Sequence, residues 1–472
     1  MSLVLKFKAA ACATWLACLP LHAQASDLPP DLPDLPTDTA VLALGDFDLP
    51  PAESGLSGLS EPRFSVGEDA TLELETRLFS NHLREGNSRG SLRQQAHYFG
   101  TRSLGNAVSL TFNLRARADW TEGQNFELDE DFNFDVQELA LSFALGTHGN
   151  LQLGRINLRN GVATGFNPTD WFRDNSLVVT GSAAAADRRN ERLGVVAVTG
   201  TTTLGRSLLQ LGYRPEISAG SNSFWTGMDS VGLGLDRTNA TEAGFVKFTP
   251  DLGTNLSVTA NALVLDGQPG VGLELSGTIG DNLVLYAEVM GQRRRSLAAE
   301  ALTDGVGSAT LRADLGANEA IGWHGQSALG LNWALPQKWV GVRDISLTFE
   351  HHFNGAGLSS AQIATLSSAS DADAAAAGAL YGLANRRQDP LARQQLFARL
   401  AWNDVWNDAD LSMLAFYVPA DGSGLGQVAL DVPITQAATL TLRAVHSFGG
   451  STSVYGANPN KSSLQAAVIW RF

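Results

Sequence analysis

The sequence predicts an all-β fold, a transmembrane antiparallel up-and-down β-barrel of about eighteen strands, and three observations support it. Segments of nine to fifteen residues alternate apolar and polar side chains, and successive side chains of a strand point to opposite faces. Tryptophans lie at segment ends, where an interfacial girdle places them: Trp120, Trp333, Trp402 and Trp470. Apolar residues make up 44% of the chain while its mean hydropathy is −0.04, as expected when one strand face meets lipid and the other water.

The first 25 residues have the pattern of a cleaved secretory signal peptide. Two lysines precede an apolar stretch, 9–21, and Ala23-Gln24-Ala25 is a small-x-small cleavage site. Two alternatives fit less well. A membrane anchor needs a longer apolar stretch, and lipoprotein processing at Cys18 needs a Leu-like residue where Trp15 stands.

The composition excludes several kinds of ligand and covalent cross-link. Both cysteines, Cys12 and Cys18, lie in the signal peptide, so the mature chain is expected to have no thiol, disulfide or Cys-ligated metal. The eight histidines are scattered, so no metal or other cofactor is expected. A formal charge of −15 gives no bulk attraction for phosphate backbones, and a nucleic-acid partner is not expected.

Residues 26–62 contain seven prolines, eight acidic residues and no lysine or arginine. Such a segment is expected to be stiff, extended and self-repelling. It is either a disordered periplasmic tail or a docking segment for a basic periplasmic partner. The barrel is expected to occupy residues 63–472.

The segment 106–120 shows the alternation most fully, with apolar side chains at every second position from Val108 to Trp120. A soluble sandwich also alternates, but these segments exceed the ~5–6 residues of soluble strands and match the ~9–11 of membrane strands. Lipid also requires every backbone amide to be paired, which forces the sheet to close. The predicted strands start near residues 70, 93, 106, 133, 150, 192, 206, 241, 254, 270, 283, 321, 342, 391, 408, 424, 437 and 463.

The connections between these strands alternate between short and long. Short periplasmic turns and long external loops are the rule for outer-membrane barrels, and an even strand number leaves both termini in the periplasm. The short connections are 103–105, 146–149, 204–205, 250–253, 280–282, 336–341, 403–407 and 433–436. The longer or glycine-rich ones include 81–91, 216–240, 295–320, 354–390 and 449–462.

Two motifs carry a family resemblance. The terminal Ala466-Ala467-Val468-Ile469-Trp470-Arg471-Phe472 resembles the C-terminal signal of Gram-negative outer-membrane β-barrels, which implies recognition of Phe472 by the barrel-assembly machinery. Leu153-Gly154-Arg155 followed by Gly165-Phe166-Asn167-Pro168-Thr169-Asp170 is similar to porin-like and alginate-export-like barrels, where a strand ending in Gly-Arg leads into an Asn-Pro-x-Asp loop. The resemblance implies a channel or exporter surrounded by outer-membrane lipid and lipopolysaccharide.

Two loops are expected to carry helical turns. Asn167 suits an N-cap, Pro168 the first helical position and Asp170 a capping box, which predicts a turn over Pro168–Phe172. The surrounding loop, 159–192, either lies on the surface or folds into the lumen as a constriction that selects by charge and shape. Ala-rich 371–388 is expected to form a helix capped by Ser370, in an external loop or in a lid over the pore.

The charged residues expected in the lumen are mixed in sign. A wet lumen tolerates them, whereas an arginine on the lipid face costs ~2–4 kcal/mol at the midplane. They form either a salt-bridge lattice that fills the barrel or a conduit whose arginines attract uronates, carboxylates or phosphates. The predicted pore-lining or selectivity residues are Arg115, Arg117, Glu138, Arg155, Arg159, Asp170, Arg173, Glu288, Glu350, Arg399 and Arg443.

We therefore expect a passive outer-membrane channel for a hydrophilic solute or for export of a polysaccharide-like polymer. One alternative is an assembly or interaction platform with a filled lumen. Another is a lipid-modifying enzyme, because Glu350-His351-His352-Phe353-Asn354-Gly355 resembles the His-x-Ser-Asn-Gly motif of barrel phospholipases. The enzyme is disfavoured because Phe353 and Asn354 stand where that motif needs its serine nucleophile. His351 and His352 are expected to face opposite sides of a strand.

Overall fold

The computed structural model describes residues 70–472 apart from 85, 178–180, 218–232, 254, 304, 342, 370–372 and 451, and without the side chains of Asp129 and Ala374. The chain divides into two units, Met1–Asp46 and Phe47–Phe472, and the described residues all belong to the second. The expected signal peptide, 1–25, and acidic segment, 26–62, lie outside the described residues. The first described strand begins at Ala70.

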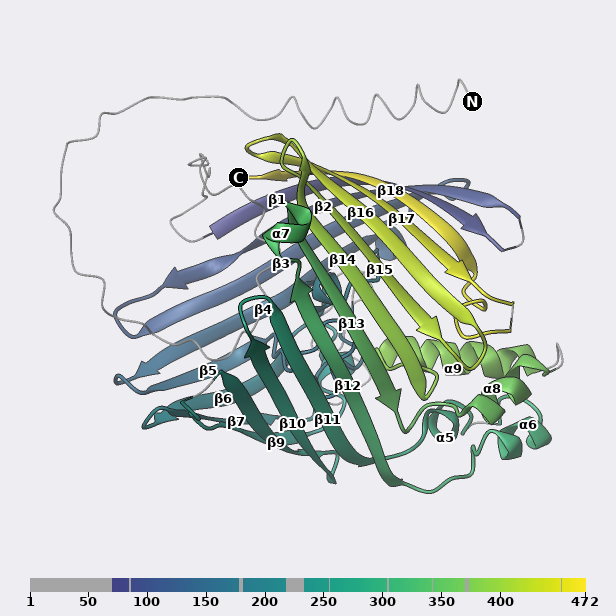
Figure 1. Ribbon diagram of the computed structural model, residues 1–472, viewed down its shortest axis with the longest axis horizontal. Helices are drawn as coiled ribbons and strands as arrows, with labels where there is room; N and C mark the ends of the chain where they lie inside the picture. The colour runs from purple at the N-terminus through teal and green to yellow at the C-terminus, as the bar shows by residue number, and fades with distance from the viewer. Residues whose placement is uncertain are drawn as a thin grey trace. The chain divides into compact units, whose positions relative to one another are not determined.

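Eighteen antiparallel strands form one closed sheet (Figure 1). Each strand pairs with its neighbours in sequence, and β1 closes the ring against β18, with Thr76 opposite Val468. The last residue completes the closure, because Phe472 and Leu72 exchange two backbone hydrogen bonds of 2.9 and 3.1 Å. The predicted fold class and strand number are confirmed.

The strands are β1 (Ala70–Leu83), β2 (Ser88–Ser103), β3 (Val108–Thr121), β4 (Phe132–Leu145), β5 (Gly149–Ile156), β6 (Val195–Leu204), β7 (Ser207–Arg214), β8 (Ala243–Thr249), β9 (Leu256–Leu265), β10 (Gln268–Ile279), β11 (Leu283–Arg294), β12 (Gly322–Ala334), β13 (Asp344–Asn354), β14 (Gln394–Trp406), β15 (Ala409–Val418), β16 (Ser423–Thr435), β17 (Ala438–Phe448) and β18 (Asn460–Arg471). The helices are α2 (Leu128–Asp131), α3 (Ala185–Asn190), α4 (Leu235–Thr238), α5 (Leu297–Ala301), α6 (Ala309–Asp314), α7 (Gln337–Val340), α8 (Ser360–Ser367) and α9 (Ala374–Arg387). None of the helices in the described ranges is long and apolar enough to cross a membrane.

The predicted strand starts differ from the observed ones by at most five residues, at β2. Several predicted connections differ in extent from the observed ones, as two examples show. The 81–91 connection is shorter, because Asn81 still pairs with Arg89. The 403–407 turn lies later, because β14 continues to Trp406 through an irregular stretch of its pairing with β15.

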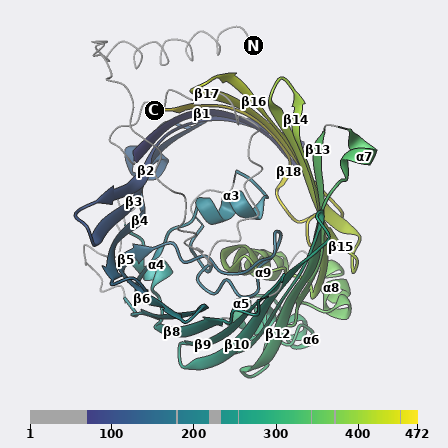
Figure 2. The same cartoon turned by 60° about the vertical axis from the view of Figure 1, so that its left-hand side comes forward.

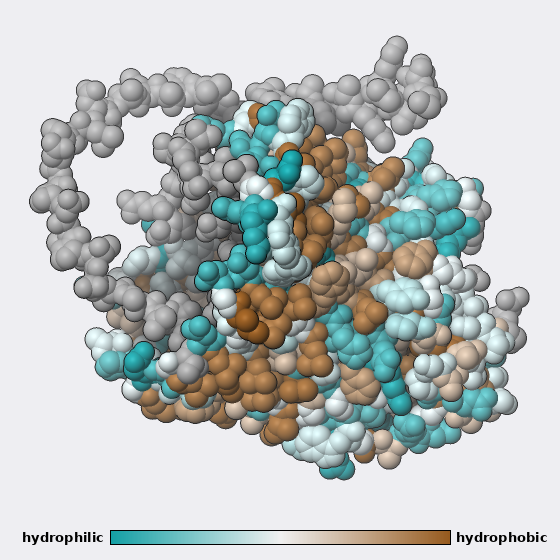
Figure 3. Space-filling view, in the orientation of Figure 1, coloured by the Kyte–Doolittle hydropathy of each residue, from teal (hydrophilic) through white to brown (hydrophobic). Residues whose placement is uncertain are grey.

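The outer face of the barrel carries an apolar belt, of which Figure 3 shows one side. Exposed large apolar side chains recur on β1 and on every strand from β4 to β18. One from each is Leu78, Leu139, Leu153, Val198, Leu211, Val246, Val264, Val271, Leu285, Leu329, Phe349, Leu396, Met413, Val428, Leu442 and Leu464. A continuous exposed belt on a closed sheet is the surface of a barrel that spans a membrane, in agreement with the predicted outer-membrane location.

Tryptophans mark the two borders of this belt. At the end with short connections, Trp333 packs edge-on against Trp339 at 5.3 Å, and Trp402 lies under the Arg343 guanidinium. At the end with long connections, Trp120 stacks on Phe126 at 5.1 Å. By the outer-membrane rule, these ends are periplasmic and external, respectively.

Helices α5, α6, α8 and α9 form a cap over part of the external end (Figure 1). The cap has its own apolar core, which includes Leu297, Leu315, Leu358 and Leu380, each at most 1% exposed. The predicted helix in 371–388 is observed as α9, which ends at Gln388 in a left-handed conformation. Its predicted N-cap, Ser370, lies outside the described residues.

Candidate functional site: the constriction of the lumen

Residues 157–177 and 181–194, between β5 and β6, fold into the ring of strands and are named the lumen loop (Figure 2). Its Trp171 and Phe172 pack against Phe245 of β8, with ring centroids 5.8 and 5.6 Å apart. Farther along, Phe166 joins an apolar cluster with Tyr286 of β11. The loop is therefore packed inside the barrel, which favours the predicted constriction over a surface loop.

Glu288 of β11 holds the first half of the lumen loop. Its carboxylate is completely buried and accepts hydrogen bonds from the backbone amides of Val162 and Ala163, both at 2.5 Å. It also accepts from the Asn167 side chain at 3.0 Å and the Thr169 hydroxyl at 3.0 Å. A buried carboxylate satisfied by donors of one segment fixes that segment firmly.

Glu350 of β13 holds the adjacent loop residues in the same way. Its two oxygens accept from the amides of Thr164 and Gly165, at 2.5 and 2.9 Å. The Tyr286 hydroxyl donates to it at 2.6 Å, and His352 Nε2 lies 2.6 Å away. Glu288 and Glu350 together attach residues 162–169 to the barrel wall.

The two neighbouring histidines face opposite sides of β13, as predicted. His352 is completely buried. His351 lies between Leu329 and Leu396 in the sheet, and both of these leucines are exposed on the outer face.

A buried ion pair closes the base of the lumen loop. Arg192 donates to both oxygens of Asp170, at 2.7 and 3.2 Å, and their side chains are 1% and 3% exposed. The same guanidinium donates to Asn157 Oδ1 at 2.9 Å and to the Leu158 carbonyl at 2.6 Å. The start and end of the loop are thereby joined through one side chain.

The predicted helical turn over Pro168–Phe172 was wrong, because this segment forms two successive turns. The two residues predicted to cap this turn, Asn167 and Asp170, bind other partners. Asp170 pairs with Arg192, and the Asn167 amide donates to the Ala163 carbonyl and to Glu288.

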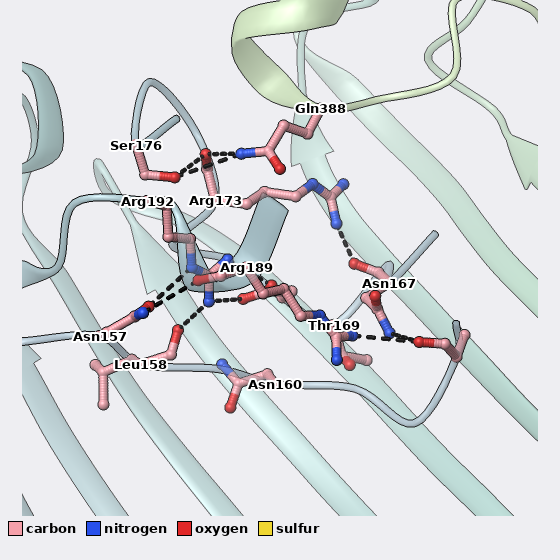
Figure 4. A network of polar contacts seen from close by, with 12 residues as sticks. Asn157, Leu158, Asn160, Asn167, Thr169, Arg173, Ser176, Arg189, Arg192 and Gln388 are labelled. Atoms are coloured by element: carbon pink, nitrogen blue, oxygen red, sulfur yellow. Dashed lines mark hydrogen bonds and ion pairs between the residues drawn. The ribbon is translucent and has the colours of Figure 1, made fainter. Parts of the chain in front are cut away.

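Asp389, just beyond α9, ties the lumen loop to the cap. Arg173 of the loop and Arg294 of β11 contact its carboxylate at 2.5 and 3.0 Å. Gln388 donates to the Arg173 carbonyl at 2.7 Å, a contact visible in Figure 4. Burial alone raises the pKa of Asp389, but the charges of Arg294, Arg173 and Arg387 lower this pKa to about 2. The carboxylate is therefore ionised over the whole physiological range.

The second half of the loop reaches the opposite strands. The Gly181 carbonyl accepts from Arg443 of β17 at 3.2 Å and from Gln465 of β18 at 2.8 Å. The Ala183 amide donates to Gln427 of β16 at 2.8 Å. With its anchors on β11 and β13, the lumen loop thus crosses the lumen from wall to wall.

The inner face of β18, β1, β2 and β3 is named the charged wall, because its side chains pair mainly with one another. Arg77 contacts Glu75 at 2.6 Å, and Arg471 contacts Glu73 at 2.7 Å. On β2 and β3, Asp119 pairs with Arg93 at 2.6 Å and Arg117 at 3.0 Å.

Arg115, on the same wall, is different. It is 4% exposed, and its Nε and Nη1 have no hydrogen-bond partner among the described residues. The charges of Glu191 in the lumen loop and of Glu75 and Asp135 on the wall act on it. A buried guanidinium edge without partners is a candidate contact for a solute or for water.

The predicted site residues fall into two groups. Arg115, Arg117, Arg399 and Arg443 lie on the inner wall, and Arg399 has no ion pair within the described part of the chain. The others hold the loop or its base: Asp170, Arg173, Glu288 and Glu350 through the contacts above, Glu138 by accepting from the Asn157 amide at 3.3 Å, and Arg155 by donating to the carbonyls of Gly194 and Leu233. Arg159 lies close enough to Glu138 for their charges to interact.

Sequence reasoning missed three contributors. Gln427 and Gln465 bind the loop from distant strands, and Asp389 binds it from an external loop. The alternation along β16 and β18 places the two glutamines on the inner face, and this was the sequence feature that could have indicated their role. The partners of Asp389 are more than 90 residues away in sequence, at Arg173 and Arg294, and no local pattern marks such a pairing.

No family model and no curated protein matches the chain. Among solved structures, OccAB4 of Acinetobacter baumannii has a TM-score of 0.47 at 6% identity, covering 87% of this chain and 99% of that one. OccK11 (OpdR) of Pseudomonas aeruginosa has a TM-score of 0.46 at 9% identity, covering 86% and 95%. The outer membrane protein opdK of Pseudomonas aeruginosa has a TM-score of 0.45 at 10% identity, covering 86% and 99%. The strand pairing and the apolar belt of the chain itself identify it as a membrane-spanning barrel.

Proposed function

We propose that this protein is a passive outer-membrane channel for a small hydrophilic solute with an anionic group. The solute passes between the lumen loop and the charged wall. The observation that carries the proposal is Arg115, a buried guanidinium on that wall whose Nε and Nη1 are unpaired among the described residues. An arginine fork of this kind suits a carboxylate or phosphate.

The lumen loop favours a small solute over an exported polymer. It is fixed by the carboxylates of Glu288 and Glu350 and by the ion pair of Arg192 with Asp170. A polymer of large cross-section requires the loop to leave the lumen, which breaks all of these contacts. A small solute requires no such change.

Two further arginines support an anionic solute. Arg399 of β14 and Arg188 of α3 are lumen residues whose guanidinium groups have no hydrogen bond or ion pair within the described ranges. Asp187 interacts with Arg399 only through its charge. Together with Arg115 of β3, they add cationic groups to the lumen, Arg188 on the loop itself and Arg399 on β14.

The test combines planar-bilayer recording with liposome swelling. The purified full chain is expected to give discrete conductance steps, and an anionic solute is expected to enter faster than neutral and cationic solutes of equal size. Absence of conductance overturns the channel. Equal entry of the three solutes overturns the anionic preference and leaves the channel intact.

A second candidate function is an interaction platform, which the acidic segment 26–62 favours through its eight acidic residues and lack of basic ones. Deleting 26–62 and comparing the periplasmic proteins that co-purify separates the two. Loss of a specific basic partner with unchanged conductance supports a docking tail on a channel. Unchanged co-purification removes the platform.

A further inference from the structure

A hollow on the outer side of the barrel lies at the external border of the apolar belt. Trp323 of β12 is 59% exposed there and stands opposite Arg293 of β11. The Trp323 ring lies beside Gly291, where an added Cβ would be 3.8 Å from it. Tryptophans of transmembrane barrels lie at the membrane–water border, so this ring marks the depth of the outer-leaflet headgroups.

The hollow is lined by Arg293, the residue that stands opposite this tryptophan in the sheet. Its volume is about 480 Å³, and Arg293, Arg295, Asn318, Glu319 and Ile321 contribute to its lining. Ile321, which immediately precedes β12, is 40% exposed. The hollow therefore lies between the apolar belt below and the cap above.

The charged groups of the hollow favour an anion. Arg293 and Arg295 are exposed, and neither guanidinium has a hydrogen bond or ion pair within the ranges that the structure describes. Glu319 is the acidic residue of the lining, so the two arginines leave a net charge of +1. Guanidinium groups bind phosphate oxygens through paired N–H donors, and an arginine stem lies along apolar surface while its head stays in the polar layer.

We propose that this hollow binds a phosphate group of an outer-leaflet glycolipid, lipopolysaccharide. The lipid is favoured over free phosphate because Arg293 of the hollow stands opposite the exposed Trp323, which marks the headgroup depth, and because Ile321 of the lining is exposed. Acyl chains of the bound glycolipid lie along the belt below, and its phosphate contacts Arg293 and Arg295. The site is on the outside of the barrel and does not depend on passage through the lumen.

The test measures binding of fluorescent lipopolysaccharide to the purified full chain in detergent by fluorescence anisotropy. The variant carries Arg293→Gln and Arg295→Gln. Its matched control is Arg102→Gln, which removes an exposed arginine at the periplasmic end of β2. Heat-modifiable migration in gels verifies that all variants form barrels.

Loss of hydrogen bonds to a charged group is expected to weaken binding of intact lipopolysaccharide at least about tenfold in the double variant. The Arg102→Gln variant is expected to bind like wild type, and dephosphorylated lipopolysaccharide is expected to bind the wild type and double variant equally weakly. Unchanged affinity of the double variant overturns the proposal. If the double substitution weakens binding of dephosphorylated lipopolysaccharide as much as it weakens binding of the intact lipid, the phosphate contact is overturned. If millimolar inorganic phosphate alone displaces the lipid, the ligand of the hollow is free phosphate and the lipid proposal is overturned.

Discussion

The inner surface of this barrel has two walls of different construction. Strands β8–β16 form a covered wall, where aromatic and aliphatic side chains pack against the lumen loop, as Phe245 and Phe397 do. Strands β18 and β1–β3 form the charged wall, where arginines and carboxylates of neighbouring strands pair with each other. The covered wall therefore resembles the core of a soluble protein, whereas the charged wall is a lattice of ion pairs.

This difference locates the route through the lumen. Trp171 and Phe172 of the lumen loop are 7% and 3% exposed, and full burial of such side chains contributes roughly 1.5–3 kcal/mol each. Moving the loop off the covered wall loses this burial. The charged wall offers the loop little apolar surface, because its side chains pair with one another through charges, so entry of a solute beside it sacrifices no such burial.

The largest expected effect tests whether the loop is part of the folded core. Arg192→Gln leaves Asp170 buried without its cation, and we expect a loss of about 3–5 kcal/mol in the free energy of unfolding. The matched control is Arg206→Gln, because Arg206 also pairs with an aspartate, at 2.7 Å, but is 81% exposed. Urea unfolding in detergent, followed by tryptophan fluorescence, measures both. Equal losses in the two variants would show that the loop is not packed as described.

A smaller effect is expected when the attachment of the loop to the covered wall is changed. Glu288→Gln places amide donors against the donors of Val162 and Ala163, which is expected to cost about 1–3 kcal/mol. Hydrogen exchange of the amides in 162–169 is expected to accelerate. Glu73→Gln is the control, because Glu73 lies on the charged wall, where it pairs with Arg471 at 2.7 Å. Attachment of the loop by Glu288 is contradicted if the control variant accelerates exchange in 162–169 as much as Glu288→Gln does.

Most of the barrel was predictable because lipid imposes a strict pattern on each strand. The period of two that fixes the outer face also fixes the inner one, and Glu288 and Glu350, predicted to point inward, contact the lumen loop. Their role was not predictable, since it depends on amides of a loop more than 100 residues away. The helical turn after Asn167 failed for the same reason, because Glu288 and Arg192 bind the side chains that local capping rules assign to the turn.

The tie between the lumen loop and the cap is expected to depend on pH only in strong acid. The pKa of Asp389 is lowered from 3.8 to about 2, so its contribution to stability is complete above about pH 5 and is lost as the pH falls through its folded-state value. Asp389→Asn removes this contribution. The difference in unfolding free energy between wild type and variant is expected to stay constant from pH 7 to 5 and to shrink by about 2 kcal/mol by pH 2. A difference that shrinks already between pH 7 and 6 would contradict the ionised pair.

The smallest effect on stability, and the most direct test of the charged wall, comes from Arg115→Gln. The unpaired guanidinium has no hydrogen bond from Nε or Nη1 to lose among the described residues, so the barrel is expected to fold normally. One unit charge a few ångströms from a hydrated path contributes about 0.5–1 kcal/mol, which corresponds to a decrease of about twofold to fivefold in the ratio of anion to cation permeability. Reversal potentials in a salt gradient measure this ratio, with Arg102→Gln, outside the lumen, as the control. An unchanged ratio in Arg115→Gln would place the route away from the charged wall, and an equal change in the control would show that overall charge sets the selectivity instead.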